Sequence, residues 1–281
     1  MAVETVQNIN PLPRLSEPCD QRWVYVCEAS SGQLKRKLQL PVYPRPNAFA
    51  GGTMIDMKVQ DGRIYMLDTD GYLLVLNHEN QPNRIPTACW MNLQSFIHSV
   101  SSVAIDSKRN IYVGGVSEGY AVLTMDANGE VQRRQHPLVE ATPECPYWYE
   151  RGFMDCDDED HLWYIHEASP ERIIRFTPQG EPCVTIGRIG PPEVDVFDRG
   201  SVGVTYKSVV AAASWSSSLK ALIWLQPGQI KLVGKNGQVT PGIALPLTLP
   251  IRGMAAGAYS DILFCVFDKT RLRLVSLEIK R

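Results

Sequence analysis

The residues that could bind a metal ion are most concentrated between positions 155 and 161, where Asp-Cys-Asp-Asp-Glu-Asp-His forms the densest acidic cluster of the sequence. Carboxylate oxygens are the ligands that Ca²⁺ and Mg²⁺ prefer. The cluster lacks the spaced Asp and Gly ligands of a calcium loop, and Cys145, Cys156, His161 and His166 lack the spacing of a zinc site. An acidic β-turn accounts for the same residues. We therefore expect no metal ion here and no cofactor.

Nucleophilic catalysis has little support in the sequence. No Gly-x-Ser-x-Gly elbow is present. The five histidines are His78, His98, His136, His161 and His166. None of them is paired in sequence with an evident Ser or Cys nucleophile, although a triad is assembled in space rather than in sequence. We predict no triad geometry between any of these imidazoles and a Ser or Cys.

Aromatic residues and arginines gather in three long segments between apolar runs, at 88–98, 137–151 and 188–201. Trp, Tyr and Arg together are typical of the residues that dominate the binding energy of protein interfaces. Large aromatic side chains also tend to be buried, so these rings could instead pack beneath their own loops. The candidate binding residues are Trp90, Tyr147, Trp148, Tyr149, Arg151, Phe197 and Arg199.

Two kinds of turn signal divide the chain into repeated units. The first resembles Asp126-Ala127-Asn128-Gly129, a tight hairpin in which glycine supplies a positive φ. Its turn residues are at positions 32, 80, 129, 180 and 237, which are 48 to 57 residues apart. The second turn leads into an apolar strand that begins near Ile64, Ile111, Leu162, Leu222 and Ile262. Together they predict units of four short antiparallel strands, and a period near 50 residues is typical of a propeller blade.

We therefore predict an all-β fold with a single β-propeller of four-stranded antiparallel blades. The count of second-strand signals favours five blades in residues 33–279, with residues 34–40 completing the last blade. Six blades are the alternative, if residues 23–40 belong to a short blade of their own. Either way, an N-terminal strand would close the ring and remove free sheet edges. Residues 1–22 would be an N-terminal extension and residues 23–281 the propeller.

The repeated unit resembles the NHL repeat. The shared pattern is a small residue, an apolar residue and Asp, then Gly or Asn before an apolar-aromatic-apolar strand, then a strand ending in Asp-x-Asn-Gly-Glu. Residues 102–134 are the closest copy, residues 50–190 fit well and residues 200–279 fit poorly. The resemblance implies a propeller fold. NHL-like propellers include protein-binding modules, RNA-binding modules and some enzymes.

Three aspartates, Asp56, Asp106 and Asp155, recur at what the sequence indicates are matching positions of the units. Carboxylates on the inner strands of a propeller could act as an acid/base pair, as in five-bladed glycosidases. An aspartate that caps one turn in each unit is the simpler explanation. The sequence leaves open whether these residues are structural or functional.

Charge and composition exclude some classes of function. The formal net charge is −2, which gives no strong positive field for nucleic acid. The N-terminal residues do not resemble a secretory signal, and the apolar runs are too short to span a bilayer. The seven cysteines form no CxxC pair and are typical of reduced thiols, which favours a cytoplasmic protein.

These observations favour a non-enzymatic, protein-binding or scaffolding propeller that acts as a subunit of a larger assembly. Two alternatives remain open. One is a funnel-site hydrolase, either lactonase-like with a divalent metal or glycosidase-like. The other is a carbohydrate-binding propeller, in which Trp and Tyr rings stack on sugars. A protein partner is expected first, a carbohydrate second, and no nucleic acid.

Overall fold

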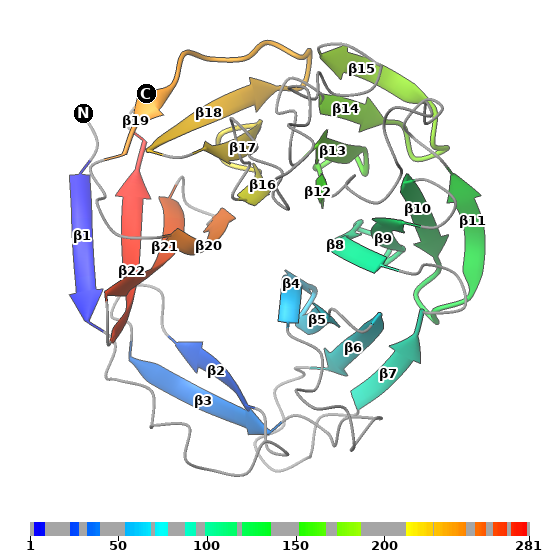
Figure 1. Cartoon of the computed structure of the whole chain (residues 1–281), viewed down its shortest axis with the longest axis horizontal. Helices are drawn as coiled ribbons and strands as arrows, with labels where there is room; N and C mark the ends of the chain where they lie inside the picture. Colours follow the sequence, from blue (N-terminus) through cyan, green and yellow to red (C-terminus); the bar gives the residue numbers. More distant parts are fainter. Residues whose placement is uncertain are drawn as a thin grey trace, which may run out of the picture.

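The computed structural model describes residues 3–8, 23–27, 33–39, 54–68, 71–77, 88–93, 99–116, 120–135, 152–166, 173–186, 212–226, 228–245, 251–256, 261–268 and 271–279. All named elements within these ranges are β-strands, and the paired strands run antiparallel. Figure 1 shows the sheets arranged around a common axis, with β4, β8, β12, β16 and β20 nearest the centre. The protein is therefore a single all-β propeller with antiparallel four-stranded blades, as the sequence predicted.

Four sheets are each formed by consecutive strands. The first contains β4 (Met54–Gln60), β5 (Arg63–Asp68), β6 (Tyr72–Asn77) and β7 (Ala88–Asn92). The second contains β8 (Ser99–Ile105), β9 (Ile111–Val116), β10 (Tyr120–Met125) and β11 (Val131–Gln135). The third contains β12 (Gly152–Cys156), β13 (Leu162–His166), β14 (Ile173–Phe176) and β15 (Pro182–Ile186). The fourth contains β16 (Ala212–Ser216), β17 (Ala221–Gln226), β18 (Gln229–Gly234) and β19 (Ile243–Ala244).

The N-terminal strands are distributed over two further sheets. β20 (Ile251–Ala256), β21 (Asp261–Asp268) and β22 (Arg271–Glu278) form a sheet whose fourth strand is β1 (Val3–Asn8). β2 (Trp23–Cys27) pairs with β3 (Leu34–Gln39) in a two-stranded sheet. The prediction that residues 34–40 complete the last unit is wrong, because β1, from the segment expected to be an extension, occupies that place. Pairing across the whole length of the chain leaves no local signal in the sequence.

The turns confirm the repeat that the sequence indicated. Gly129, Gly180 and Gly237 each have a positive φ, between 83° and 89°, at the third hairpin of their sheets. The predicted turns at positions 32 and 80 lie outside the described residues. At the first hairpin, the left-handed residue is Asp61, Arg109, Asp160 or Lys220. In the second, third and fourth sheets, the first hairpin therefore has a left-handed residue other than glycine, and the third hairpin has a left-handed glycine. In the first sheet, Asp61 is followed by Gly62, which also has a positive φ.

The hydrophobic core lies between neighbouring sheets rather than at one centre. One cluster joins the first sheet to the second through Leu67, Leu73, Val103 and Val113, all 0% exposed. Equivalent clusters join the second sheet to the third, the third to the fourth, and the fourth to the β20–β22 sheet. Burial of one such aliphatic side chain contributes about 2 kcal/mol. The second, third and fourth sheets are therefore each held by apolar contact with both of their neighbours.

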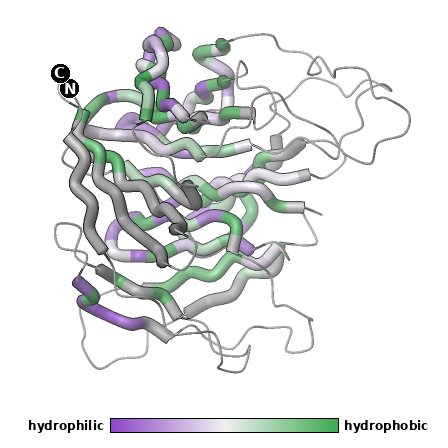
Figure 2. The backbone as a smooth tube through the Cα atoms, turned by 60° about the vertical axis from the view of Figure 1, so that its left-hand side comes forward, coloured by the Kyte–Doolittle hydropathy of each residue, from purple (hydrophilic) through white to green (hydrophobic). Residues whose placement is uncertain are grey.

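Figure 2 shows the same sheets from the side, with hydrophobic stretches running along their strands. Among the residues that the structure describes, no helix is long and apolar enough to cross a membrane.

Gly152 makes room for an aromatic ring on the inner strand of the third sheet. It precedes Met154 by two residues on β12, and Met154 pairs with Tyr164 of β13. A Cβ atom at position 152 would overlap the ring of Tyr164 and lie 2.9 Å from the carbonyl oxygen of Ile165. Both Gly152 and Tyr164 are buried, so neither the ring nor the backbone has space to move away.

Replacing Gly152 by Ala is expected to lower the free energy of unfolding by about 2–3 kcal/mol, because the added methyl group overpacks the interior. Gly62→Ala is the control, since Gly62 has a φ of +73° and nothing within 4 Å of an added Cβ. That variant should lose only about 1 kcal/mol, the cost of the left-handed backbone. Urea denaturation measures both, and equal losses would contradict the overpacking argument.

Candidate functional site

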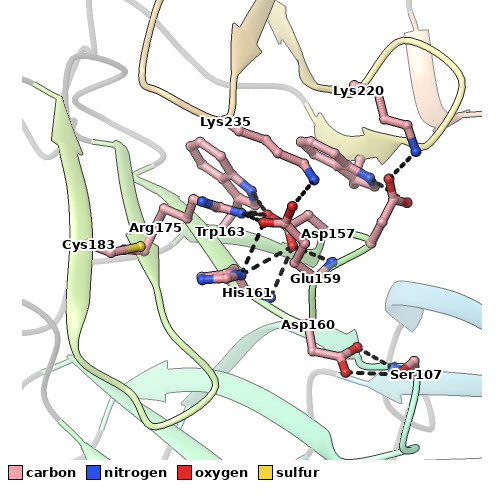
Figure 3. A network of polar contacts seen from close by, with 12 residues as sticks. Ser107, Asp157, Glu159, Asp160, His161, Trp163, Arg175, Cys183, Lys220 and Lys235 are labelled. Carbon is pink, nitrogen blue, oxygen red and sulfur yellow. Dashed lines mark hydrogen bonds and ion pairs between the residues drawn. The ribbon is translucent and has the colours of Figure 1, made fainter.

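The acidic cluster predicted at residues 155–161 forms a turn between β12 and β13 whose centre is the buried carboxylate of Asp157 (Figure 3). Oδ1 accepts the backbone N–H groups of Glu159 and His161, at 2.9 and 3.1 Å. Oδ2 accepts the indole N–H of Trp163 at 3.0 Å and the Nε–H of Arg175 at 2.8 Å. The carboxylate is fully covered and each oxygen has two donors. The prediction of an acidic β-turn is confirmed.

Asp106 has the same position in the turn between β8 and β9. It accepts the backbone N–H groups of Lys108 at 3.0 Å and Asn110 at 2.7 Å. Its other oxygen accepts the amide N–H of Asn110 at 2.7 Å and the hydroxyl of Tyr112 at 3.1 Å. A carboxylate that accepts several N–H groups stabilises a turn whose backbone is otherwise short of partners. Asp106 and Asp157 are therefore turn-capping residues.

The three acidic residues after Asp157 connect the third sheet to both neighbours. Asp158 accepts the indole N–H of Trp215 at 3.0 Å, the hydroxyl of Ser217, and Lys220 Nζ at 2.7 Å. These residues belong to the fourth sheet. Burial by itself would raise the pKa of Asp158, but the hydrogen bonds from Lys220, Ser217 and Trp215 outweigh it and the pKa is lowered.

Glu159 and Asp160 continue the pattern in opposite directions (Figure 3). Glu159 accepts Lys235 Nζ of the fourth sheet and Arg175 of its own sheet, at 2.7 and 2.8 Å. The hydrogen bonds from Lys235 and Arg175 lower the pKa of Glu159 to about 2. Asp160 accepts both the backbone N–H and the hydroxyl of Ser107, each at 2.8 Å, in the turn of the second sheet.

Two stacked indole rings lie beneath these ion pairs. Trp163 and Trp215, from the third and fourth sheets, have ring centroids 6.2 Å apart and planes within 15°. The guanidinium of Arg175 is 5.6 Å from the Trp163 ring, and Lys235 Nζ is 5.8 Å from the Trp215 ring. Each cation thus contacts an aromatic face as well as a carboxylate, which adds to the attraction between the sheets.

Asp157, Glu159 and His161 have ligand atoms within 4.8 Å of one another, which is close enough to hold a metal ion. Arg175 Nη2 already lies 2.7 Å from Asp157 and 2.8 Å from Glu159, and Lys235 lies 2.7 Å from Glu159. A divalent cation would have to displace both side chains and the turn hydrogen bonds of Asp157. The partners of Asp157 and Glu159 therefore favour an internal ion-pair network over a metal site.

His161 is the one histidine whose side chain the structure describes. Its Nδ1 lies 3.6 Å from Asp157 and 3.9 Å from Glu159, and no Ser or Cys of the described residues hydrogen-bonds to it. The side chains of His78, His98, His136 and His166 lie outside the described part. The absence of a triad stays a prediction.

A second group of charged residues lies on the inner strands. Asp56 of β4 accepts the backbone N–H of Val103 on β8 at 2.8 Å. Asp155 of β12 accepts the backbone N–H of Trp215 on β16, also at 2.8 Å. In both cases an inner-strand carboxylate binds the backbone of the next sheet, so it fixes the height of one strand relative to the other.

Lys58 links the first sheet to the third. Its Nζ lies 3.3 Å from Asp155 Oδ2, and the two side chains are 17% and 15% exposed. Burial opposes the charge of Lys58, but the carboxylates of Asp155 and Asp56 outweigh it and the pKa is raised. Burial raises the pKa of Asp56 despite the nearby Lys58, and it raises the pKa of the Cys156 thiol well above its ordinary value. A neutral thiol is a poor nucleophile.

The three recurring aspartates do not occupy matching positions, so that prediction is wrong. Asp56 lies opposite Leu67 in the ladder of β4 and β5, and Asp155 lies opposite Trp163, two places nearer the turn. Asp106 follows β8 in the turn itself. The offsets of two and four residues cannot be seen in a sequence whose units differ in length, since only the strand pairing defines the register.

The predicted aromatic site lies largely outside the described residues. This holds for Tyr147, Trp148, Tyr149, Arg151, Phe197 and Arg199. Trp90 lies on β7, where its backbone pairs with Leu74, and only its strand position is described. Sequence reasoning missed the cations of the network, Lys58, Arg175, Lys220 and Lys235. Lys220 and Lys235 could have been found from the sequence, because they lie in the turns of the fourth sheet, the unit that follows the acidic turn.

The comparisons with known proteins support the fold alone. No protein-family model matches the sequence, and no curated protein matches it. Among solved structures, a streptogramin B lyase is 12% identical with a TM-score of 0.59, over 100% of this chain and 88% of that one. The PQQ-bound aldose sugar dehydrogenase of Streptomyces coelicolor is 13% identical with a TM-score of 0.58, over 100% and 99%. The β-propeller domain of Cps50 (Swd1) from Myceliophteria thermophila is 7% identical with a TM-score of 0.54, over 98% and 100%.

These structurally similar proteins share one architecture but differ in what they do. Fold and site together define a β-propeller protein whose described charged residues connect one sheet to the next. The neighbours do not decide its function, because enzymes and non-enzymatic modules share this fold.

Replacing Asp157 by Asn keeps the shape of the side chain and removes its charge. Arg175, whose side chain is 9% exposed, then loses its buried partner, and we expect a loss of about 2–4 kcal/mol in the free energy of unfolding. Asp126→Asn is the matched control, since Asp126 caps a turn through Asn128 and Glu130 at the exposed surface. It should lose about 1 kcal/mol or less. Similar losses in the two variants would show that Arg175 contributes nothing.

The lowered pKa of Glu159 predicts how the stability of the folded chain depends on pH. Its pKa is lowered from 4.5 to about 2 in the folded chain. A lowered pKa means that the stabilisation is fully present above about pH 4.5 and is lost as the pH falls towards 2. Glu159→Gln should therefore be less stable than the parent at pH 6 and converge with it as the pH falls to about 2. Urea titrations at low salt measure this, with the exposed Glu181→Gln as control; a pH-independent difference would contradict it.

Proposed function

We propose that this chain is a non-enzymatic, protein-binding propeller that serves as a scaffold within a larger assembly. The observation that carries the proposal is the use of its described charged groups. Asp56, Asp106, Asp155 and Asp157 each accept hydrogen bonds that cap a turn or join two sheets. The side chains that could have acted in catalysis are thus part of the framework.

A hydrolase is the alternative, and the inner strands are where it would act. An acid/base pair of Asp56 and Asp155 would require both carboxylates to exchange protons with a substrate. Each is instead bound to a backbone N–H of the next sheet, and Asp155 also pairs with Lys58. Substrate binding would break contacts between sheets, which favours the scaffold over the hydrolase.

The ring itself is part of the proposal. The pairing of Val3–Asn8 with β22 supports closure of the ring by an N-terminal strand. Counting the two-stranded β2–β3 sheet as a short blade supports six blades rather than five. We propose residues 23–281 as the main body of the propeller. We place the protein in the cytoplasm, which the free thiols of Cys156 and Cys183 support.

The partner is expected to contact the segment 137–151, whose Tyr147, Trp148, Tyr149 and Arg151 have the chemistry of an interface hot spot. Trp90, Phe197 and Arg199 belong to the other two candidate segments. A carbohydrate that stacks on these rings is the second candidate ligand. A net charge of −2 argues against nucleic acid.

Trp148→Ala tests this proposal. If Trp148 is a hot spot, the variant should bind the native partner about 30-fold more weakly, equivalent to about 2 kcal/mol. The measurement is affinity purification of the tagged chain from the cell that produces it, followed by titration of the co-purified partner. Trp148→Phe, which keeps an aromatic ring, should lose less.

Circular dichroism and thermal melting of both variants provide the check on folding. A variant that unfolds would show that Trp148 is structural, and unchanged binding would remove this segment from the interface. Purification of a lone monomer that carries a divalent metal would favour the hydrolase instead.

A further inference from the structure

The second and third sheets share one framework with a constant offset in sequence. Asp106 caps the first turn of the second sheet, and Asp157 caps the first turn of the third. On the third strands, Thr124 has the position that Arg175 has in the next sheet, 51 residues later. The two sheets therefore have the same turn and the same ladder, but a short hydroxyl side chain replaces the guanidinium that binds Asp157.

The sign of the charge is reversed at the equivalent positions. Glu159 contacts Arg175 at 2.8 Å, which shows that the side chains at these two positions meet in the third sheet. The equivalent residues of the second sheet are Lys108 and Thr124. Arg133 of β11 adds a second cation, because it pairs directly with Thr124 in the ladder and side chains paired in this way are neighbours. The second sheet thus brings two cations and a hydroxyl together.

Two of these groups have a buried polar atom without a hydrogen-bond partner. Thr124 is 8% exposed, and neither its Oγ1 nor the Nε of Arg133 has a partner in the structure. Arg133 donates through Nη1 to the backbone carbonyl of Gln179 in the third sheet. Buried polar groups are almost always paired, so these two atoms indicate a partner other than the chain itself. The turns that border this place all belong to the described residues: 106–110, 126–130, 157–161 and 177–181.

The nearby carboxylate of Asp106 is occupied by its own turn. Its four donors are the backbone N–H groups of Lys108 and Asn110, the side-chain amide of Asn110 and the hydroxyl of Tyr112. Asp126, in the third hairpin of the sheet, likewise accepts N–H groups of its own turn. Among the described residues, no carboxylate forms an ion pair with either cation. The positive charges of this place are therefore not used inside the framework.

We propose that Thr124, Arg133 and Lys108 bind an oxyanion, a phosphate or carboxylate group, between the second and third sheets. The Nε–H of Arg133 and the hydroxyl of Thr124 donate to its oxygens, and the exposed Lys108 adds positive charge at the rim. Hydrogen bonds from a guanidinium to an oxyanion are among the strong ones in proteins. The site goes beyond the proposed protein-binding role and is separate from Trp148, so either can fail without the other.

Calorimetric titration of the full chain with inorganic phosphate, and separately with acetate, tests the site at constant ionic strength. One of the two oxyanions should bind saturably at a single site, and the comparison distinguishes a phosphate site from a carboxylate site. Arg133→Gln should weaken that binding at least about tenfold, because it removes the charged donor. Lys108→Gln should weaken it about threefold. Arg109→Gln is the matched control, since the neighbouring guanidinium contacts Asp61 of the first sheet, and it should bind normally.

Thr124→Val provides a readout that does not depend on charge. It keeps the shape of the side chain and removes the hydroxyl. In urea denaturation without an oxyanion, the variant should be at least as stable as the parent, because a buried hydroxyl without a partner opposes folding. With a saturating oxyanion, the parent should gain more stability than the variant.

Four results would overturn the proposal. They are the absence of saturable binding, equal binding by Arg133→Gln and the parent, equal weakening by Lys108→Gln and Arg109→Gln, and a loss of stability in Thr124→Val without any oxyanion. The third would indicate general attraction by charge, and the fourth would indicate that a water molecule already pairs with the hydroxyl. If Arg133→Gln does not fold, the exposed Lys108→Gln and the isosteric Thr124→Val still decide between these outcomes.

Discussion

The arrangement of this propeller depends on buried carboxylates whose acceptors are filled by the protein's own N–H groups. Asp157 binds two backbone amides, an indole and a guanidinium at once, and Asp106 repeats the pattern one sheet earlier. A buried charge without partners costs far more free energy than a paired one. Each of these turns is therefore stable only when all the donors to its carboxylate are in place. Apolar contact holds adjacent sheets together, and the carboxylates determine how they are aligned.

Carboxylates of the first and third sheets bind groups on the neighbouring sheets and so align each sheet with the next. Asp56 binds the backbone of the second sheet, and Asp155 binds that of the fourth. Asp158 and Glu159 bind side chains of the fourth sheet and Asp160 those of the second. Lys58 reaches past the second sheet to the third. A repeat protein ordinarily has contacts between nearest neighbours only, so this ion pair adds cooperativity across one intervening unit.

The sequence predicted the parts of the fold that depend on local chemistry. Glycines at 129, 180 and 237 marked hairpins because a tight turn needs a positive φ, and the strands after Ile111, Leu162 and Leu222 followed from their apolar runs. The sequence did not predict that Val3–Asn8 pairs with β22, or that Lys58 meets Asp155, because no local pattern encodes a partner so distant. The register of Asp56 against Asp155 was missed for the same reason. The aromatic candidates around Trp148 remain predictions, outside the described residues.

The pairing of β1 with β22 has a mechanical consequence. Val3 lies opposite Glu278 and Asn8 opposite Arg273, so the outer ends of both strands are at the same end of their ladder. A force that separates Val3 from Glu278 loads the hydrogen bonds of this antiparallel pair one after another, and not all together as in shear. Tension applied between these two strand ends would therefore open the last sheet one hydrogen bond at a time.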